Sequence, residues 1–180
     1  DSPTDAKPVF FHKKWAWSWL IWSTALCLFV IVTPGFTGLN DLRATSNQQP
    51  DLLIEATASR WLWEYNYIDQ TTKEPIVTLK RSSAELVLPN ESLIRFKITA
   101  KENDVLHSFW IPAFRQKIDA VPGLITTVDI STNRLGSFDE DVNYRLQCAE
   151  LCGLGHATMM TKVRVIDKEE FKKWITENRN

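Results

Sequence analysis

A run without any charged residue, Trp15–Asn40, limits most strongly what this chain of 180 residues can fold into. Its first part, Trp15–Val32, would span roughly 27 Å as a helix, which is close to the thickness of a bilayer's hydrocarbon core. Tryptophans gather at its amino end, where amphipathic indole rings favour the headgroup region. The run therefore predicts one transmembrane helix over residues 15–36, which stops or bends near Pro34.

Basic residues before this run predict its orientation. Lys7, Lys13 and Lys14 precede the apolar segment, and cytoplasmic flanks carry an excess of such residues. We therefore expect residues 1–14 in the cytoplasm or matrix and everything after Asn40 on the outer face. A secretory signal peptide is the alternative, but the apolar run exceeds the usual core of about 7–15 residues and no A-x-A site follows it.

The residues after the apolar run are enough for one domain of ordinary size. Composition limits the functions that this domain can have. The formal net charge is -1, so bulk charge does not favour nucleic acid as a partner. Three cysteines, an odd number, do not form a disulfide framework, and Cys27 lies in the apolar run, where a thiol is usually a small hydrophobe. Only Cys148 and Cys152 remain to be explained.

Short apolar runs dominate the chain after a polar linker expected over residues 37–50. Within residues 51–166 these runs, from LLIEATA and RWLWEYNYI to TKVRVI, alternate with turn residues. Many short strands at this spacing predict an antiparallel β sandwich or barrel. Residues 167–180 are expected to form one closing helix, because Asp167 can cap it and a helical apolar pattern follows.

The segment Cys148–Met159, CAELCGLGHATM, carries the clearest chemistry. It places two thiols, one imidazole and one thioether in the pattern C-x-E-x-C-x-x-x-H-x-x-M, between two expected strands. These soft ligands suit copper, whereas zinc prefers four strong ligands and takes a thioether poorly. A mononuclear blue-copper site uses one cysteine, and two cysteine sulfurs can bridge two copper ions. The pattern therefore predicts a dinuclear copper site on a loop.

A dinuclear site would need a second histidine from another part of the chain. The sequence has three histidines, and His12 precedes the expected transmembrane helix, which leaves His107 in ENDVLHSFWIPAF. A disulfide between Cys148 and Cys152, or histidines that only fill the core, are the structural alternatives. The joint occurrence of two cysteines, two histidines and a methionine favours copper.

With these motifs the chain resembles subunit II of the heme-copper oxidases, the subunit that carries the CuA centre. The likeness runs from the apolar helix to the carboxyl terminus, through RWLWEYNY, DVLHSFWIP, KIDAVPG and CAELCGLGHATM. It implies a mainly β, cupredoxin-like antiparallel sandwich with an N-terminal transmembrane helix and a short C-terminal helix. The copper ligands that it implies are Cys148 and Cys152 as bridges, His107 and His156 as terminal ligands, and Met159 and the Glu150 carbonyl as weak ligands. It also implies that the Glu150 side chain reaches a magnesium ion at the interface with the catalytic subunit.

The resemblance implies roles for residues outside the ligand set as well. Trp61 corresponds to the residue through which electrons enter from cytochrome c, with Trp63 supporting it, although period-2 alternation alone would place both in the core. Asp119 matches a family acid near the docking face, where carboxylates steer a basic cytochrome. Trp110 is expected to exclude water from His107 and hold its ring by packing.

The function that the resemblance implies is electron transfer. The chain would take single electrons from cytochrome c into CuA and pass them to heme in catalytic subunit I, which reduces dioxygen to water beside other oxidase subunits. No C-x-x-C-H is present, so no heme is expected on this chain. The expected site is the bacterial inner membrane with the copper domain on the periplasmic face, or else the mitochondrial inner membrane facing the intermembrane space.

Two other functions stay open at this point. One is the CuA subunit of a nitric oxide reductase, and the other is a membrane-tethered copper-binding or delivery protein, which the presence of only two methionines disfavours. The chain also departs from most relatives of the family it resembles. Those relatives have two transmembrane helices, and this sequence shows one, which corresponds to their second. No acidic residue lies between Lys7 and Asn40, where many relatives carry a glutamate at the mouth of a proton pathway, so proton uptake is not expected here.

Overall fold

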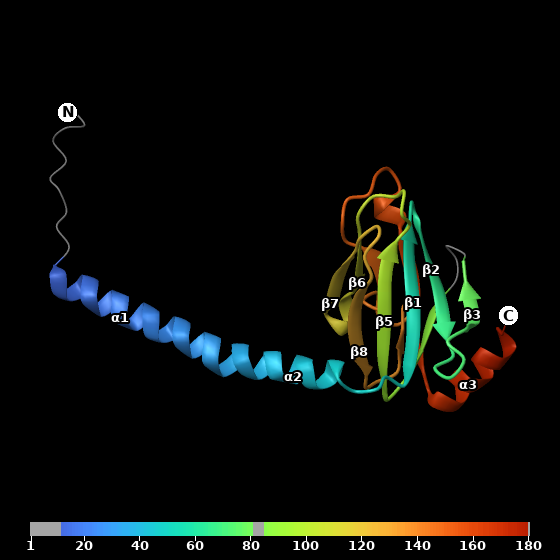
Figure 1. The fold of residues 1–180 in the computed structure, drawn as a ribbon, viewed down its shortest axis with the longest axis horizontal. Coiled ribbons are helices and arrows are strands. Elements are labelled where there is room, and N and C mark those ends of the chain that lie inside the picture. Colours follow the sequence, from blue (N-terminus) through green and yellow to red (C-terminus); the bar gives the residue numbers. More distant parts are fainter. Residues whose placement is uncertain (1–11, 81–84, 180) are drawn as a thin grey trace. The chain divides into compact units, whose positions relative to one another are not determined.

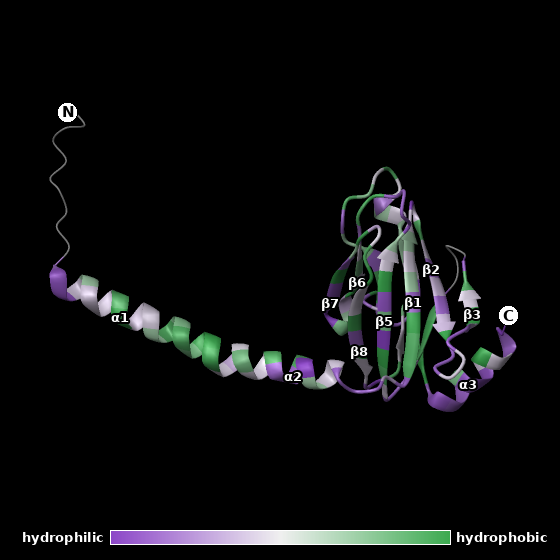
Figure 2. Ribbon diagram, viewed as in Figure 1, coloured by the Kyte–Doolittle hydropathy of each residue, from purple (hydrophilic) through white to green (hydrophobic). Residues whose placement is uncertain are grey.

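The computed structural model describes residues 12–80 and 85–179, which fall into two compact units that divide after Gln48 (Figure 1). Lys7 and most of the predicted inner segment lie outside the described residues. The described part of the first unit contains α1 (Lys13–Val30), a π-helical segment (Ile31–Phe36) and α2 (Thr37–Ser46). Together these form one helix of 34 residues, long and apolar enough to cross a membrane (Figure 2).

The helix does not end at Pro34, where the sequence predicts a stop or a bend, and it continues through the first part of the predicted linker. Proline removes one backbone donor and crowds the preceding turn. The π-helical segment widens the turn around Pro34, as such bulges commonly do where a helix is disturbed. The Thr33 hydroxyl donates to the Phe29 carbonyl at 2.8 Å, and the Thr37 hydroxyl donates to the Thr33 carbonyl. These hydroxyl groups hydrogen-bond carbonyls of the widened turn.

The second unit is a sandwich of two β sheets. One sheet has five strands in the order β3-β2-β1-β5-β8, and the other has the order β4-β11-β10-β6-β7 with β9 beside β11. The strands of the first sheet are β1 (Leu52–Ser59), β2 (Leu62–Ile68), β3 (Pro75–Leu79), β5 (Ser92–Ala100) and β8 (Thr126–Thr132). Those of the second are β4 (Leu86–Pro89), β6 (His107–Ile111), β7 (Gln116–Ala120), β9 (Gly136–Ser137), β10 (Arg145–Cys148) and β11 (Met160–Ile166). Short 3-10 turns follow β6 (Pro112–Phe114) and precede β11 (His156–Thr158).

Most neighbouring strands are antiparallel, as predicted, but β1 pairs with β5 and β11 pairs with β4 in parallel. Parallel neighbours cannot be joined by a hairpin, so the chain must travel through other strands before it returns. Between β1 and β5 it does so through β2, β3 and β4, the last of which lies in the opposite sheet. This crossing between sheets closes the sandwich.

The core forms where the period-2 pattern points one row of side chains inward. On β5, Ile94, Phe96 and Ile98 are fully buried, and the polar residues between them are only partly covered. On β2 the inward row is aromatic and consists of Trp63, Tyr65 and Tyr67. Each such buried side chain contributes about 1.5–3 kcal/mol through loss of apolar surface from water.

A short helix, α3 (Lys168–Glu177), packs at one end of the sandwich, which we call the helix end. Its predicted cap is confirmed, because the Asp167 carboxylate accepts hydrogen bonds from the amides of Glu169 at 3.0 Å and Glu170 at 2.9 Å. Trp174 of the helix packs on the ring of Tyr67, with centroids 5.2 Å apart. The opposite end carries the cysteines and is called the metal end.

Candidate metal centre

Two paired strands and one loop position the predicted ligands at the metal end. β6 begins with His107 and β10 ends with Cys148, which pairs with Phe109 of β6. The ligand loop, residues 149–159, then connects β10 to β11. Its two ends are fixed by backbone hydrogen bonds of 3.0 Å, from Ala149 to the Ser108 carbonyl and from Cys148 to the Met159 carbonyl. The loop is therefore anchored to the sheet on both sides.

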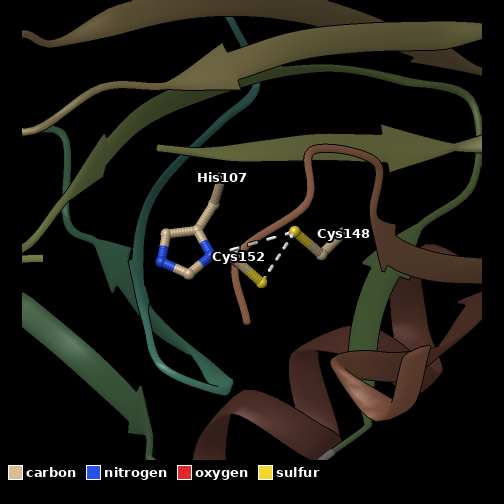
Figure 3. Close-up of side chains that lie close together, drawn as sticks. All are labelled: His107, Cys148 and Cys152. Carbon is tan, nitrogen blue, oxygen red and sulfur yellow. Dashed lines mark hydrogen bonds between the residues drawn. The ribbon is translucent and has the colours of Figure 1, made fainter. Parts of the chain in front are cut away.

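The two thiols and one imidazole meet at the centre of this arrangement (Figure 3). The Sγ atoms of Cys148 and Cys152 are 3.7 Å apart, and Nδ1 of His107 lies 3.8 Å from Sγ of Cys148. All three ligand atoms lie within 4.8 Å of one another and all three residues are buried. The separation of the sulfurs exceeds that of a disulfide, which is about 2.05 Å, so the cysteines are free.

The other predicted donors surround the same pair of sulfurs. Nδ1 of His156 lies 3.6 Å from Sγ of Cys152, and Sδ of Met159 lies 3.9 Å from that sulfur. The carbonyl oxygen of Glu150 is 3.2 Å from Sγ of Cys148. The structure thus brings together six donors that the sequence distributes over 53 positions, from residue 107 to residue 159.

Burial sets the protonation of the metal-free site. Burial and the neighbouring Cys148 raise the pKa of the Cys152 thiol to about 12, so that this thiol carries its proton at neutral pH. Burial lowers the pKa of His107, so its imidazole is neutral and has a lone pair to offer. Metal binding would displace the thiol proton.

Asp104 is a member of the site that motif reasoning missed. Its Oδ1 lies 3.4 Å from Nε2 of His107, and it accepts hydrogen bonds from the amides of Val105 at 2.7 Å and Arg60 at 2.9 Å. Burial acts to raise the pKa of Asp104, but these amides, His107 and the Arg60 guanidinium outweigh it and lower that pKa. A proton on Nε2 that faces this carboxylate leaves the Nδ1 lone pair directed at the sulfurs. The signal was present in the sequence as an acid three positions before the histidine.

Trp61 lies directly against the ligand loop. Its Nε1 donates a hydrogen bond of 3.1 Å to the carbonyl of Cys152, and its side chain is 39% exposed. The indole occupies the space that a Cβ would fill at Gly155, where such an atom would lie 2.5 Å from the ring. Gly153 has a φ of 113°, a conformation that favours glycine, and a Cβ added there would lie 3.2 Å from the same ring. The loop glycines therefore make room for an indole between the ligands and the surface.

Of the two other predicted tryptophans, Trp63 lies in the core, as period-2 alternation predicts, and Trp110 differs from its expected position. Trp63 is 1% exposed and cannot meet a partner protein, but its ring packs edge-on against His107 with centroids 6.5 Å apart. The expected packing of Trp110 against His107 is wrong, because strand alternation points Trp110 to the opposite face of β6. There it lies under the Arg145 guanidinium, 5.9 Å from the ring centroid. Phe109, which shares a face with His107, packs against Trp63 instead.

The predicted acids lie outside the cluster of donors. Asp119 is exposed on β7 and pairs across the sheet with Ser108. Asp139, another exposed acid, forms an ion pair of 2.7 Å with Lys162. The Glu150 side chain is exposed on the ligand loop, while its carbonyl points inward.

The donor set fits copper better than zinc or a single blue-copper ion. Two thiols, two imidazoles and a thioether are soft ligands, and a thioether is a poor zinc ligand. One cysteine would suffice for a mononuclear centre, whereas here two sulfurs face each other with one histidine beside each. The arrangement suits a pair of ions that share both sulfurs.

A two-sheet sandwich that collects these donors on a loop before its last long strand is a cupredoxin-like metal-binding domain. Comparison with known sequences then identifies the family. The family model for the periplasmic domain of cytochrome c oxidase subunit II matches residues 73–166. The chain belongs to this family, and the resemblance read from its motifs is confirmed.

Individual relatives agree with this assignment. The heme-copper oxidase subunit 2 of Aeropyrum pernix is 39% identical over 121 residues, which cover 67% of this chain and 46% of the relative. Cytochrome c oxidase subunit 2 of Schizosaccharomyces pombe is 32% identical and is aligned over 88% of this chain and 68% of the relative. Among solved structures, the periplasmic domain of subunit II of cytochrome oxidase from Bradyrhizobium japonicum is 31% identical with a TM-score of 0.59, covering 73% of this chain and 95% of that one. The chain spans about half the length of the first curated relatives that it matches, 46% and 51% for two of them.

Proposed function

We propose that this chain is the electron-accepting subunit of a terminal heme-copper oxidase and that it holds a dinuclear copper centre. The observation that supports this most directly is the convergence of four further donors on two cysteine sulfurs 3.7 Å apart. The proposed ligands are Cys148 and Cys152 as bridges, His107 and His156 as terminal ligands, and Met159 and the Glu150 carbonyl as weak ligands. When bound, such a centre would supply one-electron redox chemistry with the charge spread over two ions and two sulfurs.

The chain's own residues would keep this centre rigid and dry. His107, Cys148 and Met159 are buried, and the backbone bonds that join β6, β10 and β11 restrain the loop from both ends. Asp104 would hold the His107 ring in the tautomer that faces the sulfurs. Ligands that hardly move between oxidised and reduced states reduce the cost of reorganisation, which favours rapid transfer.

Electrons would enter through Trp61 from a one-electron donor such as cytochrome c. Its hydrogen bond to the Cys152 carbonyl connects the protein surface to a ligand residue without an intervening gap. Trp63 would act behind it by packing against His107. The electron would then pass to a heme in the catalytic subunit, where dioxygen is reduced to water.

Glu150 would serve the interface with that catalytic subunit. Its carbonyl faces Cys148, and its carboxylate lies exposed on the outer side of the same loop. Carboxylate oxygens are suitable ligands for magnesium. We therefore assign the Glu150 side chain to an interfacial magnesium ion.

The helical unit would anchor the protein in the bacterial inner membrane, with the β domain on the periplasmic face. The apolar composition of its helix and the periplasmic description of the matching family support this placement. We assign residues 15–36 to the membrane, 51–166 to the copper domain and 167–180 to the closing helix. Residues 37–50 would join the first two, and 1–14 would remain on the inner side.

Copper content and an electron paramagnetic resonance spectrum of the full chain test the proposal. We expect two copper ions per chain and a spectrum in which the unpaired electron is shared equally by both. A single copper with a mononuclear spectrum, or zinc in its place, would contradict the dinuclear assignment. Cys27→Ser serves as the control, since Cys27 is exposed on α1 and far in sequence from the ligands.

A further inference from the structure

α1 carries a groove along one face at its amino end. Six residues at helical spacing line it: Lys13, Lys14, Trp17, Ser18, Ile21 and Trp22. All six are exposed, and residues three or four positions apart in a helix lie on the same face. Trp19 lies on the opposite face, since each residue turns the helix by about 100°. The groove therefore belongs to one side of the helix and not to its whole circumference.

The chemistry of the groove changes along the helix axis. Lys13 and Lys14 place two ammonium groups at its start, a hydroxyl and an indole follow, and Ile21 lies towards its apolar end. Figure 2 shows the same change along α1, from hydrophilic at its start to hydrophobic further on. From Lys14 to Trp22 the helix rises by roughly 12 Å, which covers the headgroup layer of one leaflet and the first carbons of its acyl chains. The groove thus follows the polar-to-apolar order of a phospholipid.

The polar groups of the groove have no protein partner in the part of the chain that the structure describes. Lys13 and Lys14 form no ion pair there, and the first acid along the helix is Asp41. The Ser18 hydroxyl makes no hydrogen bond to a described residue, whereas the Ser23 hydroxyl donates to a carbonyl of its own helix at 3.1 Å. α1 also begins without a side-chain cap or an acid in its first turn, so the positive end of its dipole adds to the two ammonium charges. The groove therefore presents uncompensated positive charge and a free hydroxyl.

A lipid suits this face better than a second helix does. Helix pairs in membranes use small residues that let their backbones approach closely. This face instead presents two large indole rings, Trp17 and Trp22, of the kind that favours the headgroup region. A protein partner would also have to bring carboxylates to neutralise the two lysines, whereas the inner leaflet supplies anionic headgroups at that depth. Charge and shape therefore both favour a lipid.

We propose that the groove binds an anionic phospholipid of the inner leaflet, with its phosphate between the ammonium groups of Lys13 and Lys14. The Ser18 hydroxyl and the Trp17 indole N–H donate to its ester oxygens, and the first part of an acyl chain lies against Ile21. The bound lipid fixes the depth of the helix, because the charged and the apolar parts of the groove are satisfied together at one position only. This inference rests on the proposed membrane placement of the helical unit and is independent of the copper assignment.

Quenching of tryptophan fluorescence by brominated lipids tests the proposal. The full chain is reconstituted in phosphatidylcholine vesicles and titrated with phosphatidylglycerol that is brominated near its ester groups, because bromine quenches only the indoles that it contacts. We expect half-maximal quenching at about tenfold less brominated phosphatidylglycerol than brominated phosphatidylcholine, since both lysines attract the anionic headgroup. Lys13→Gln combined with Lys14→Gln should remove this preference. Lys13→Arg combined with Lys14→Arg keeps both charges and should retain it.

Two matched controls separate a binding site from bulk charge. Lys172 and Lys173 are another adjacent pair of exposed lysines, on α3. Lys172→Gln combined with Lys173→Gln removes the same charge from the β domain and should leave the lipid preference as it is. Trp17→Phe should reduce the quenching that is selective for phosphatidylglycerol, because Trp17 lines the groove. Trp19→Phe removes an indole from the opposite face and should leave that selective quenching unchanged.

The proposal is wrong if the double glutamine variant at positions 13 and 14 keeps the native preference, or if Trp17→Phe and Trp19→Phe lower the selective quenching equally, as a uniform lipid shell would. If the isolated chain is quenched selectively but the assembled oxidase is not, the catalytic subunit covers this face instead. If the glutamine variant fails to insert, the comparison of the two tryptophan variants still decides. A native chain that alkaline carbonate washes off the vesicles would contradict the proposed membrane placement, whereas an inserted chain without lipid preference contradicts this inference alone.

Discussion

The two ends of the β sandwich use the same aromatic strand, β2, in different ways. At the helix end, the Tyr67 hydroxyl donates to the Val87 carbonyl at 2.9 Å and accepts from the Val87 amide at 3.1 Å, and its ring is covered by Trp174. At the metal end, the Trp63 indole N–H is buried with no hydrogen-bond partner among the described residues, and Trp61 is partly exposed. A buried donor without a partner costs about 1–3 kcal/mol. The aromatic residues at the helix end therefore stabilise the fold fully, whereas the unpartnered indole N–H at the metal end lowers the stability of the domain next to the proposed site.

This contrast predicts that substitutions at the two ends separate into different measurements. Changes at the helix end should lower the free energy of unfolding and leave the copper spectrum as it is. Changes at the metal end should alter copper binding or electron uptake and lower the free energy of unfolding of the copper-free chain by no more than about 1 kcal/mol. Binding sites are commonly found in the less stable parts of a fold.

The largest effect is expected from the bridging sulfurs. Cys148→Ser or Cys152→Ser removes a soft ligand that both ions would share, so the dinuclear spectrum should disappear and electron uptake should fall to the background rate. Copper analysis and paramagnetic resonance measure the first result, and stopped-flow reduction measures the second. Because serine is close in size to cysteine, the copper-free variants should unfold at nearly the same denaturant concentration as the native chain. A variant that keeps two coppers and the shared-electron spectrum would show that the sulfurs are not bridges.

Sequence alone could identify this site because most of its donors are local. One segment of the sequence contains Cys148, Cys152, His156 and Met159. Because these residues are close in sequence, the sequence alone predicts that their side chains lie close together in space. Only His107 comes from another strand. It could be predicted because the sequence has just three histidines and His12 precedes the expected transmembrane helix. The β sandwich and the Asp167 cap were equally accessible, since period-2 alternation and capping are short-range signals.

Features that depend on distant neighbours were not accessible. The parallel pairing of β1 with β5 joins segments with β2, β3 and β4 between them, and no local pattern specifies it. The role of Asp104 depends on Arg60, which lies 44 positions away. The position of Trp110, in contrast, was predictable from the sequence. Side chains alternate between the two faces of a strand, so Trp110, three positions after His107, belongs on the opposite face of β6, although the two residues are close in sequence.

The next largest effect is expected at the helix end. Tyr67→Ala should lower the free energy of unfolding by about 3–5 kcal/mol, because it removes a fully buried ring from the core. Tyr67→Phe should cost less, about 1–3 kcal/mol, since it keeps the ring but leaves the Val87 amide and carbonyl without the hydroxyl. Urea unfolding of the copper-free chain measures both. Copper-loaded samples of the same variants should show an unchanged spectrum, and a change in that spectrum would mean that the two ends are coupled.

A pair of glycines makes the comparison sharper, because each would place a new Cβ against an aromatic ring. At Gly155 the atom would lie 2.5 Å from the Trp61 ring, and at Gly136 it would lie 2.4 Å from the buried Tyr144 ring. Trp61 can move outward, so Gly155→Ala should slow electron uptake by about tenfold through misplacement of the indole. Tyr144 has no such freedom, so Gly136→Ala should cost about 1–3 kcal/mol of unfolding free energy and leave uptake unchanged.

Gly38→Ala is the control for this pair, since nothing lies within 4 Å of the added atom on α2. It should change neither the uptake rate nor the stability of the β domain. If Gly155→Ala destabilises the domain as strongly as Gly136→Ala and leaves uptake unaffected, then Trp61 is a packing residue and electrons enter by another route.

The smallest effects are expected from two carboxylates that make similar hydrogen bonds at opposite ends. Asp104 accepts from the amides of Arg60 and Val105, and Asp167 accepts from the amides of Glu169 and Glu170. Asp104→Ala and Asp167→Ala should each lower the free energy of unfolding by about 1 kcal/mol, because each leaves two amides without their acceptor.

Only Asp104 also faces a proposed copper ligand, at 3.4 Å from Nε2 of His107. Asp104→Ala should therefore shift the reduction potential of the centre and the paramagnetic resonance parameters of the coordinated histidine, because the ring loses the group that fixes its tautomer and orientation. Asp167→Ala should leave both unchanged, although its cost in stability is the same. If both variants lose the same stability and only Asp104→Ala changes the spectrum, then the two ends differ in function and not in the strength of these hydrogen bonds. If Asp104→Ala leaves the potential and the spectrum intact, the carboxylate only caps the backbone, and the orientation of His107 depends on its packing against Trp63.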